Sequence, residues 1–254
     1  MFRTFTLSVI AFVVVIGLNL TACQPWNVQA QADDAKSNPM EQTQPLPSQL
    51  PTPQPPSTPV PQIQTYSQVP DWARLVDIQP INPNIQLDIR YGTVDNFLKK
   101  KLYPVSRCLL RREVAEKLSL VQQDVEKIGL GLKVFDCYRP WSVTKQMWEI
   151  LPDPRYVANP ERGSRHNRGA AVDLTLVDLK TGKELPMPTD FDDFTEEAAR
   201  DYPDHDPEAR RNSNLLGYHM ERRGFEPLVT EWWHFDSVGW QKFSLLDVQM
   251  DKVP

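Results

Sequence analysis

Two short segments of the chain carry side chains whose types and spacing could bind a metal. The first, SRHNRGAAVD, contains His166 and Asp173, and the second, TEWWHF, contains Glu231 and His234. A catalytic zinc site typically takes three protein ligands from His, Asp and Glu and keeps a fourth position for water. Two imidazoles and one carboxylate would fill the protein positions, and the remaining carboxylate would be a general base. Together the segments predict a metal-dependent hydrolase.

Each segment also has a simpler interpretation. His166 and Asp173 would share one face of a helix, but Gly169 and the β-favouring residues after it favour a loop followed by a strand, and such a pair is more often a surface pair. Glu231 and His234 would point to opposite faces of a regular strand, so the chain must bend or bulge there for both to reach one metal. Otherwise the aromatic neighbours of His234 are core residues and Glu231 is a solvated acid.

Hydrophobic periodicity predicts the elements that must position these side chains. Pro140 excludes the helical region for the preceding residue and can itself open a helix, so Arg139 is expected at a strand-to-helix corner that faces a site. The elements do not follow strict βαβ alternation, which indicates an α+β fold with a small, mainly antiparallel sheet and flanking helices. The predicted strands lie at 85–89, 132–137, 170–177 and 228–235, and the predicted helices at 112–128, 141–150 and 214–223.

The composition divides the 254 residues, 24 of them proline, into three regions. Residues 1–22 are typical of a lipoprotein signal peptide, because a short apolar run ends in the box Leu-Thr-Ala-Cys and would leave a lipidated Cys23. An ordinary signal peptide with an incidental cysteine is the alternative. Residues 23–70 are rich in Pro and Gln and predict a disordered tether that reaches roughly 40 Å if flexible. Residues 71–254 are expected to fold as one domain.

Charge and cysteine content narrow the possible partners and compartments. The net charge is −5, and removal of residues 1–22 deletes only Arg3, so 27 basic and 33 acidic residues leave −6. Nucleic acid is therefore excluded as a partner. In an oxidising compartment Cys108 and Cys137 could form a disulfide, but they could equally be buried thiols, since sequence does not give their separation.

Four motifs occur in an order that resembles a known family. The chain contains, between Ile85 and Phe235, the motifs DIRYGTVDNF, DCYRP, SRHNRGAAVDLTL and EWWHF. These motifs resemble those of the bacterial D-alanyl-D-alanine dipeptidases, which are zinc DD-peptidases related to the vancomycin-resistance dipeptidase. The resemblance implies a zinc DD-peptidase (hedgehog-like) fold with one zinc ion per chain. It implies that the zinc ligands are His166, Asp173 and His234. It further implies that Glu231 is the general base and that Arg139 stabilises the transition state. For the substrate, it implies that Ser164 contacts the carboxylate and that Asp192, rather than Asp190 or Asp193, binds the ammonium.

The resemblance implies hydrolysis of the D-alanyl-D-alanine dipeptide to D-alanine, in cell-wall peptide turnover or scavenging. The alternatives are a zinc carboxypeptidase or endopeptidase acting on longer peptidoglycan stem peptides, and a tethered wall-binding module without catalysis. The vancomycin-resistance relatives act in the cytoplasm, whereas this sequence predicts a membrane-anchored lipoprotein of the cell envelope that faces the periplasm or the exterior. A resistance role is therefore not expected.

Overall fold

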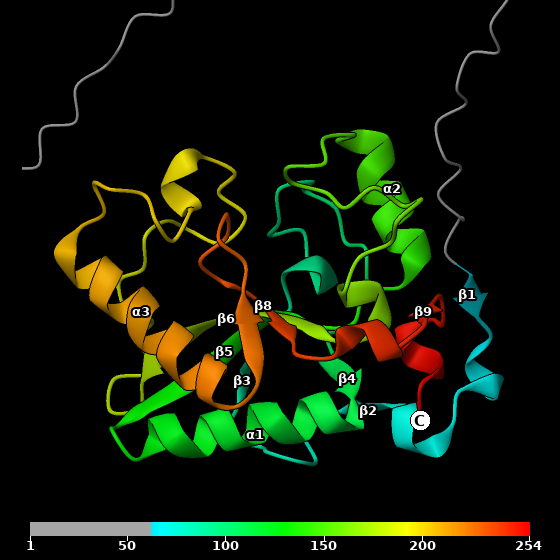
Figure 1. Ribbon diagram of the computed structural model, residues 1–254, viewed down its shortest axis with the longest axis horizontal. Coiled ribbons are helices and arrows are strands. Elements are labelled where there is room, and N and C mark those ends of the chain that lie inside the picture. Colours follow the sequence, from blue (N-terminus) through cyan, green and yellow to red (C-terminus); the bar gives the residue numbers. More distant parts are fainter. Residues whose placement is uncertain (1–61) are drawn as a thin grey trace, which may run out of the picture. The chain divides into compact units, whose positions relative to one another are not determined.

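The computed structural model describes residues 62–254, and its centre is a five-stranded sheet with strand order β3-β5-β6-β8-β7 (Figure 1). Only β3 and β5 pair in parallel, and the other neighbours are antiparallel. The prediction of a small, mainly antiparallel sheet is therefore confirmed. The strands are β3 (Gln86–Leu87), β5 (Leu130–Asp136), β6 (Ala171–Asp178), β8 (His234–Ser237) and β7 (Phe225–Pro227).

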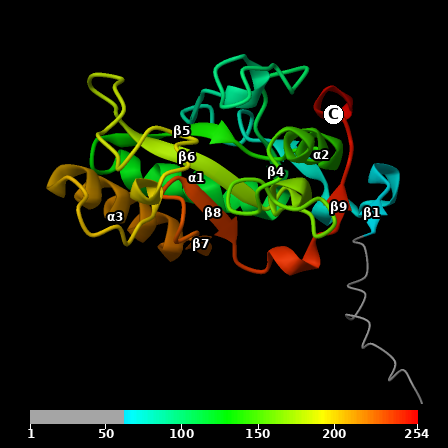
Figure 2. The same cartoon turned by 90° about the horizontal axis from the view of Figure 1, so that it is seen from above.

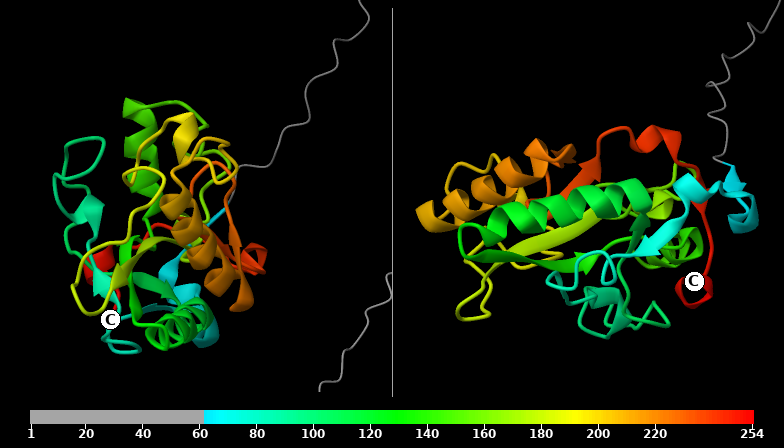
Figure 3. Two further views of the ribbon diagram at one scale, coloured as in Figure 1. Left: turned by 90° about the vertical axis from the view of Figure 1, so that its left-hand side faces the viewer. Right: turned by 90° about the horizontal axis from the view of Figure 1, so that it is seen from below.

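Two helices lie side by side against one face of this sheet, α1 (Arg112–Glu126) and α3 (Pro207–Arg222) (Figure 3). Helix α1 buries apolar residues at intervals of three and four, which gives it one continuous apolar stripe. It ends before Gly129, whose φ of +80° suits glycine. Helix α3 begins at Pro207, and the Asp206 side chain caps it by accepting hydrogen bonds from two backbone amides.

Helix α2 (Trp141–Ile150) lies on the opposite side of the sheet from α1 (Figure 1). Seen from above, β5, β6 and β8 run side by side with α1 behind them (Figure 2). The corner between β5 and α2 is where Pro140 predicted it, and it contains Arg139. The central strands and this corner therefore bring together segments that are far apart in the sequence.

The domain contains two further small sheets, and one of them includes residues before the predicted boundary. Strand β1 (Ile63–Gln64) pairs in parallel with β9 (Leu245–Leu246), and β2 (Leu75–Asp77) pairs with β4 (Leu109–Arg111). The fold therefore begins before residue 71, because residues 63–64 belong to a sheet and Val69 is buried. Residues 62–70, which were expected to belong to the tether, are therefore part of the folded domain. The signal peptide, Cys23 and the tether up to residue 61 lie outside the described residues.

The sequence-based elements differ from the structure at three places. The strand predicted at 228–235 is wrong, because β7 ends at Pro227, residues 228–233 form a turn, and β8 begins at His234. The strand at 85–89 shortens to β3 and is followed by a 3-10 helix, Arg90–Gly92. Helix α3 starts seven residues before the predicted residue 214. The first difference matters most, because it changes how Glu231 is presented.

A disulfide joins Cys108, just before β4, to Cys137, just after β5. Their Cα atoms are 5.2 Å apart, and both residues are buried in the hydrophobic core. The structure thus resolves the two alternatives for these cysteines in favour of the bridge. Within residues 62–254 no helix combines the length and the apolar character needed to cross a bilayer.

Candidate metal centre and active site

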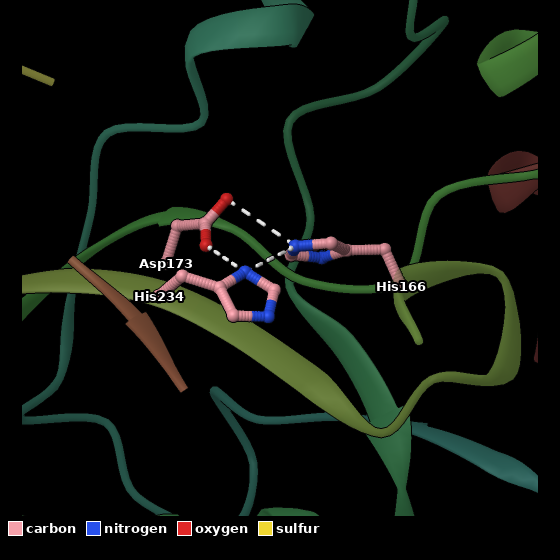
Figure 4. A group of neighbouring side chains, drawn as sticks. All are labelled: His166, Asp173 and His234. Carbon is pink, nitrogen blue, oxygen red and sulfur yellow. Dashed lines mark hydrogen bonds and ion pairs between the residues drawn. The ribbon is translucent and has the colours of Figure 1, made fainter. Parts of the chain in front are cut away.

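Three side chains from separate segments converge at one end of the central strands (Figure 4). His166 opens a 3-10 helix (His166–Arg168), Asp173 lies on β6, and His234 is the first residue of β8. Asp173 and His234 are direct cross-strand partners, so the sheet register brings them together. One possible ligand atom from each residue lies within 4.8 Å of the other two, and all three residues are buried, with at most 7% of their surface exposed.

The donor atoms of this cluster fit a metal such as zinc. His166 Nε2 lies 3.2 Å from His234 Nδ1, 3.4 Å separates His166 Nε2 from Asp173 Oδ2, and His234 Nδ1 is 2.9 Å from Asp173 Oδ1. Two ring nitrogens that face each other require a proton or a cation between them. Two imidazole nitrogens and one carboxylate form a typical protein ligand set for catalytic zinc. The three predicted ligands therefore lie together in the arrangement that metal binding requires.

Without a metal, the electrostatics of the cluster favour bound protons. Burial raises the pKa of Asp173, but the two neighbouring imidazoles have the stronger combined effect and hold it well below the ordinary value. Burial lowers the pKa of His234, but hydrogen bonds to Asp173 and Asp236 raise it to about 10. A dication would replace these protons, since metal ligands must be deprotonated. Metal binding at this site is therefore expected to release protons.

The outer nitrogen of each histidine has its own partner. His166 Nδ1 lies 2.6 Å from the backbone carbonyl of Cys137, and His234 Nε2 lies 3.0 Å from Asp236 Oδ1. A ring that donates its outer N–H to an oxygen keeps the lone pair of the inner nitrogen free for a metal. Both histidines are therefore oriented with one nitrogen toward the cluster. Sequence patterns did not identify Asp236, which has no place in the matched motifs.

Glu231 reaches the cluster from the turn between β7 and β8. Its Oε2 is 4.0 Å from His234 Nδ1, and 18% of its side-chain surface is exposed. Burial raises the pKa of Glu231 to about 6, and the nearby His234 opposes this rise. The turn removes the geometric difficulty of a regular strand, because Glu231 and His234 no longer alternate across a sheet. A carboxylate at this position can exchange protons near neutral pH.

Arg139 lies at the corner after β5 and is held by Asp136. Asp136 Oδ2 accepts hydrogen bonds from Arg139 Nη2 at 2.7 Å and Nε at 3.1 Å, while Oδ1 accepts one from Tyr103 at 2.8 Å. Burial alone would lower the pKa of Arg139, but Asp136 raises it well above its usual range, so the guanidinium stays charged. Asp136 begins the DCYRP motif, which was the available signal for this partner.

Asp192 is connected to Arg139 by Tyr91, whose side chain contacts both residues. Both Asp192 carboxylate oxygens accept from the Tyr91 hydroxyl, at 3.2 and 3.0 Å, and the Tyr91 ring lies 5.0 Å from the guanidinium carbon of Arg139. Burial, then the charge of Asp173, raises the pKa of Asp192 well above its ordinary value. Asp192 has a φ of +60°, which is uncommon for a residue with a side chain. Such a carboxylate would be stabilised by a cationic ligand.

Ser164 lies beside the first histidine. Its hydroxyl oxygen accepts a hydrogen bond from the backbone amide of His166 at 3.1 Å, and its own amide donates to Asn167 Oδ1. Ser164 is 7% exposed, so its hydroxyl lies beside the backbone of His166 and is largely shielded from solvent. The structure therefore places Ser164 near the site, and its contact with a substrate carboxylate stays a prediction.

The fold and this site define a metal-dependent peptidase. Residues 71–250 match the model of peptidase family M15, described as D-ala-D-ala dipeptidase, and the chain belongs to this family. Its M15 fold and its zinc-peptidase class agree with the sequence-based expectations. The chain is 37% identical over 166 residues to the D-alanyl-D-alanine dipeptidase of Escherichia coli (strain K12), across 65% of this chain and 86% of that protein. It is 32% identical over 174 residues to that of Enterococcus faecium, across 59% and 85%.

Proposed function

We propose that this protein hydrolyses the D-alanyl-D-alanine dipeptide to two molecules of D-alanine. The observation that carries the proposal is the buried His166, Asp173 and His234 cluster, with the Glu231 carboxylate 4.0 Å from His234. Relatives that are 37% and 32% identical are D-alanyl-D-alanine dipeptidases, which supports the substrate.

The residues of the site divide the reaction between them. His166, Asp173 and His234 would hold the zinc ion, which would supply a Lewis acid for the carbonyl and lower the pKa of a bound water toward neutral pH. Glu231 accepts the proton of the attacking water and delivers it to the amine that leaves. Arg139 presents its guanidinium to the oxygen on which negative charge develops, and its ion pair with Asp136 fixes that donor beforehand. These are the proton transfers and the charge stabilisation that amide hydrolysis requires.

The two ends of a free dipeptide carry opposite charges, and the site offers a partner of each kind. The Asp192 carboxylate would bind the ammonium, because a nearby positive charge offsets the free-energy cost of burying the ionised carboxylate. The Ser164 hydroxyl would donate to the carboxylate of the substrate. An acyl group on the substrate nitrogen removes the ammonium charge, so N-acylated peptides are expected to bind less well.

One observation favours a second candidate, a carboxypeptidase or endopeptidase for longer stem peptides. A cavity of about 820 Å³ opens beside Asp192 and is lined by aromatic and charged side chains. Its lining includes Asp192 but none of His166, Asp173 and His234, so it would hold the part of a longer substrate that extends past Asp192. The lining includes Arg90, Phe135, Phe191, Asp192 and Trp232.

We also propose a position in the cell envelope, with the domain tethered to a membrane through lipid on Cys23. The lipoprotein-type sequence that ends at Cys23 supports this location. The disulfide between Cys108 and Cys137 supports export as well, because disulfides persist mainly in oxidising compartments. Mass spectrometry of the mature protein tests the anchor: a diacylated Cys23 N-terminus is expected, and a mature chain that begins elsewhere would contradict it.

A substrate panel separates the two catalytic candidates. The zinc-loaded protein is assayed on D-alanyl-D-alanine, on its N-acetyl derivative and on a pentapeptide that ends in the same two residues. The free dipeptide is expected to have the highest kcat/KM, and Asp192→Asn should reduce its advantage over the acetylated form. Faster turnover of the acylated substrates would instead support the carboxypeptidase.

A further inference from the structure

We infer that Asp236, held by Arg165, is a positioning residue that fixes His234 for metal binding. This inference rests on the metal site of the proposed function. It assigns part of the zinc affinity of that site to the carboxylate of Asp236, which is not itself a metal ligand. Asp236 touches neither the catalytic base Glu231 nor Arg139 among the side-chain hydrogen bonds of residues 62–254. Its effect must therefore pass through the His234 ring.

The geometry places Asp236 and the metal cluster on opposite edges of the same imidazole. His234 Nδ1 faces Asp173 and His166, at 2.9 and 3.2 Å, while Nε2 faces Asp236 Oδ1 at 3.0 Å. A neutral imidazole that donates from Nε2 has its lone pair on Nδ1. Asp236 therefore selects the tautomer whose Nδ1 can bind a metal, and its negative charge makes that nitrogen a stronger donor.

The strand holds Asp236 in register with His234. Residues i and i+2 of a strand point to the same face, and both residues belong to β8. Asp236 pairs with Ala171 of β6 on one side and with Glu226 of β7 on the other, so its backbone is fixed by two neighbouring strands. The Asp236 side chain is 11% exposed, which limits competition from water. The pair is therefore set by the sheet and does not depend on a mobile side chain.

Arg165 binds the second oxygen of this carboxylate. Its Nε lies 3.4 Å from Asp236 Oδ2, and its guanidinium carbon is 4.9 Å from the centre of the Trp240 ring. Arg165 also immediately precedes His166, so the segment that carries one metal ligand supports the other. Because 46% of the Arg165 side chain is exposed, this ion pair is expected to contribute less than the buried hydrogen bond.

The two histidines differ in a way that makes the inference testable. The outer nitrogen of His166 bonds to the backbone carbonyl of Cys137, which no substitution removes. The outer nitrogen of His234 bonds to a side chain, which can be shortened or neutralised. Zinc affinity should therefore depend on the residue at position 236.

The test compares zinc binding by the full chain and its variants, measured by competition with a chromogenic chelator. Asp236→Ala should raise the zinc Kd by about 10- to 100-fold, the usual cost of losing such a partner. Asp236→Asn should have a smaller effect, because its amide oxygen still accepts the N–H but carries no charge. Arg165→Gln should raise the Kd by only a few-fold. Asp153→Ala is the matched control, since Asp153 also pairs with an arginine, Arg155, in an exposed turn, and it should leave the Kd unchanged.

Activity at increasing zinc distinguishes positioning from damage to the fold. If Asp236 acts through zinc affinity, saturating zinc restores the kcat of Asp236→Ala to within a few-fold of the wild type. The inference would be overturned if Asp236→Ala and Asp236→Asn both bound zinc as tightly as the wild type. It would also be overturned if saturating zinc did not restore the activity of Asp236→Ala. If the alanine variant does not fold, Asp236→Asn decides. A wild-type protein that binds no zinc would instead refute the proposed function.

Discussion

The disulfide between Cys108 and Cys137 is expected to stabilise the domain strongly. The two cysteines are 29 residues apart in the sequence. In the chain-entropy model, a closed loop of about 30 residues corresponds to roughly 3.6 kcal/mol of stability. For a domain of this size each kcal/mol shifts the melting temperature by about 2–4 °C, so loss of the bridge should lower Tm by about 7–14 °C.

Loss of the bridge should also weaken metal binding. The Cys137 carbonyl accepts the outer hydrogen bond of His166, and Cys137 stands between Asp136 and Arg139 in the sequence. The bridge therefore anchors the backbone that orients one metal ligand and the guanidinium. Reduction releases this anchor without removing a ligand. A measurable rise in the zinc Kd is expected to accompany the lower Tm.

The assay is thermal unfolding of the metal-free protein after refolding with or without a phosphine reductant. This comparison keeps every side-chain atom, whereas serine substitutions would bury unpaired hydroxyl groups. The double variant Cys108→Ala/Cys137→Ala is the control, and its Tm should not respond to the reductant. A difference of less than about 2 °C between the oxidised and reduced wild type would refute the reasoning, on the scale of Tm shifts for such domains.

Three further predictions follow from the charges of the site. Activity should decline as pH falls below about 6, because Glu231 has a pKa of about 6 and must be ionised to accept a proton. Bound zinc would replace the positive charge of the protonated histidines, which already lowers this pKa in the metal-free site. A pH profile of kcat/KM with an acid midpoint above 7 would contradict this role. Asp192→Asn should raise the Tm of the metal-free protein at pH 7. The folded-state pKa of Asp192 is raised, so this residue makes the folded protein less stable as pH rises above the unfolded-state pKa near 4. The same substitution should raise KM for the free dipeptide, and an unchanged KM would exclude Asp192 from substrate binding. Removal of zinc with a chelator should abolish hydrolysis and lower Tm, because a ligand that binds only the folded state stabilises it; dialysis into zinc should restore both, and activity that persists in metal-free buffer would disprove metal dependence.

The side chains of the metal-binding cluster could be predicted from sequence because their chemistry is local to short motifs. His166, Asp173 and His234 are residue types that zinc prefers, and the four motifs occur in the order of the family. Arg139 was placed correctly for a different reason: Pro140 restricts the backbone before it, which produces the corner between β5 and α2.

The turn that presents Glu231 could not be predicted from local propensity. Trp232 and Trp233 favour strands, so residues 228–235 were expected to continue as one. In the structure, the Trp232 amide donates to the carbonyl of Ala198, and the Arg200 amide donates to the carbonyl of Val229. These contacts with a segment about 30 residues earlier hold the turn in place. Tertiary contacts therefore override the local preference.

The partners of the site residues depend on distances that sequence does not give. Asp192 meets Tyr91 across 101 positions of sequence, and the disulfide needs two cysteines with close Cα atoms. Asp236 could be identified only from the structure, in which its carboxylate lies beside Nε2 of His234 on β8. These features follow from how the strands pair.

Release of D-alanine by the zinc-loaded protein tests the proposed activity most directly. D-alanyl-D-alanine is given to the wild type and to Glu231→Gln, and zinc is quantified in the same samples. The wild type is expected to hold one zinc per chain and to release two D-alanine molecules per dipeptide. Glu231→Gln should retain the zinc and lose about 10²- to 10⁴-fold in kcat, the usual contribution of a general base. A zinc-loaded wild type that releases no D-alanine, or a zinc-loaded Glu231→Gln that is fully active, would contradict the proposal.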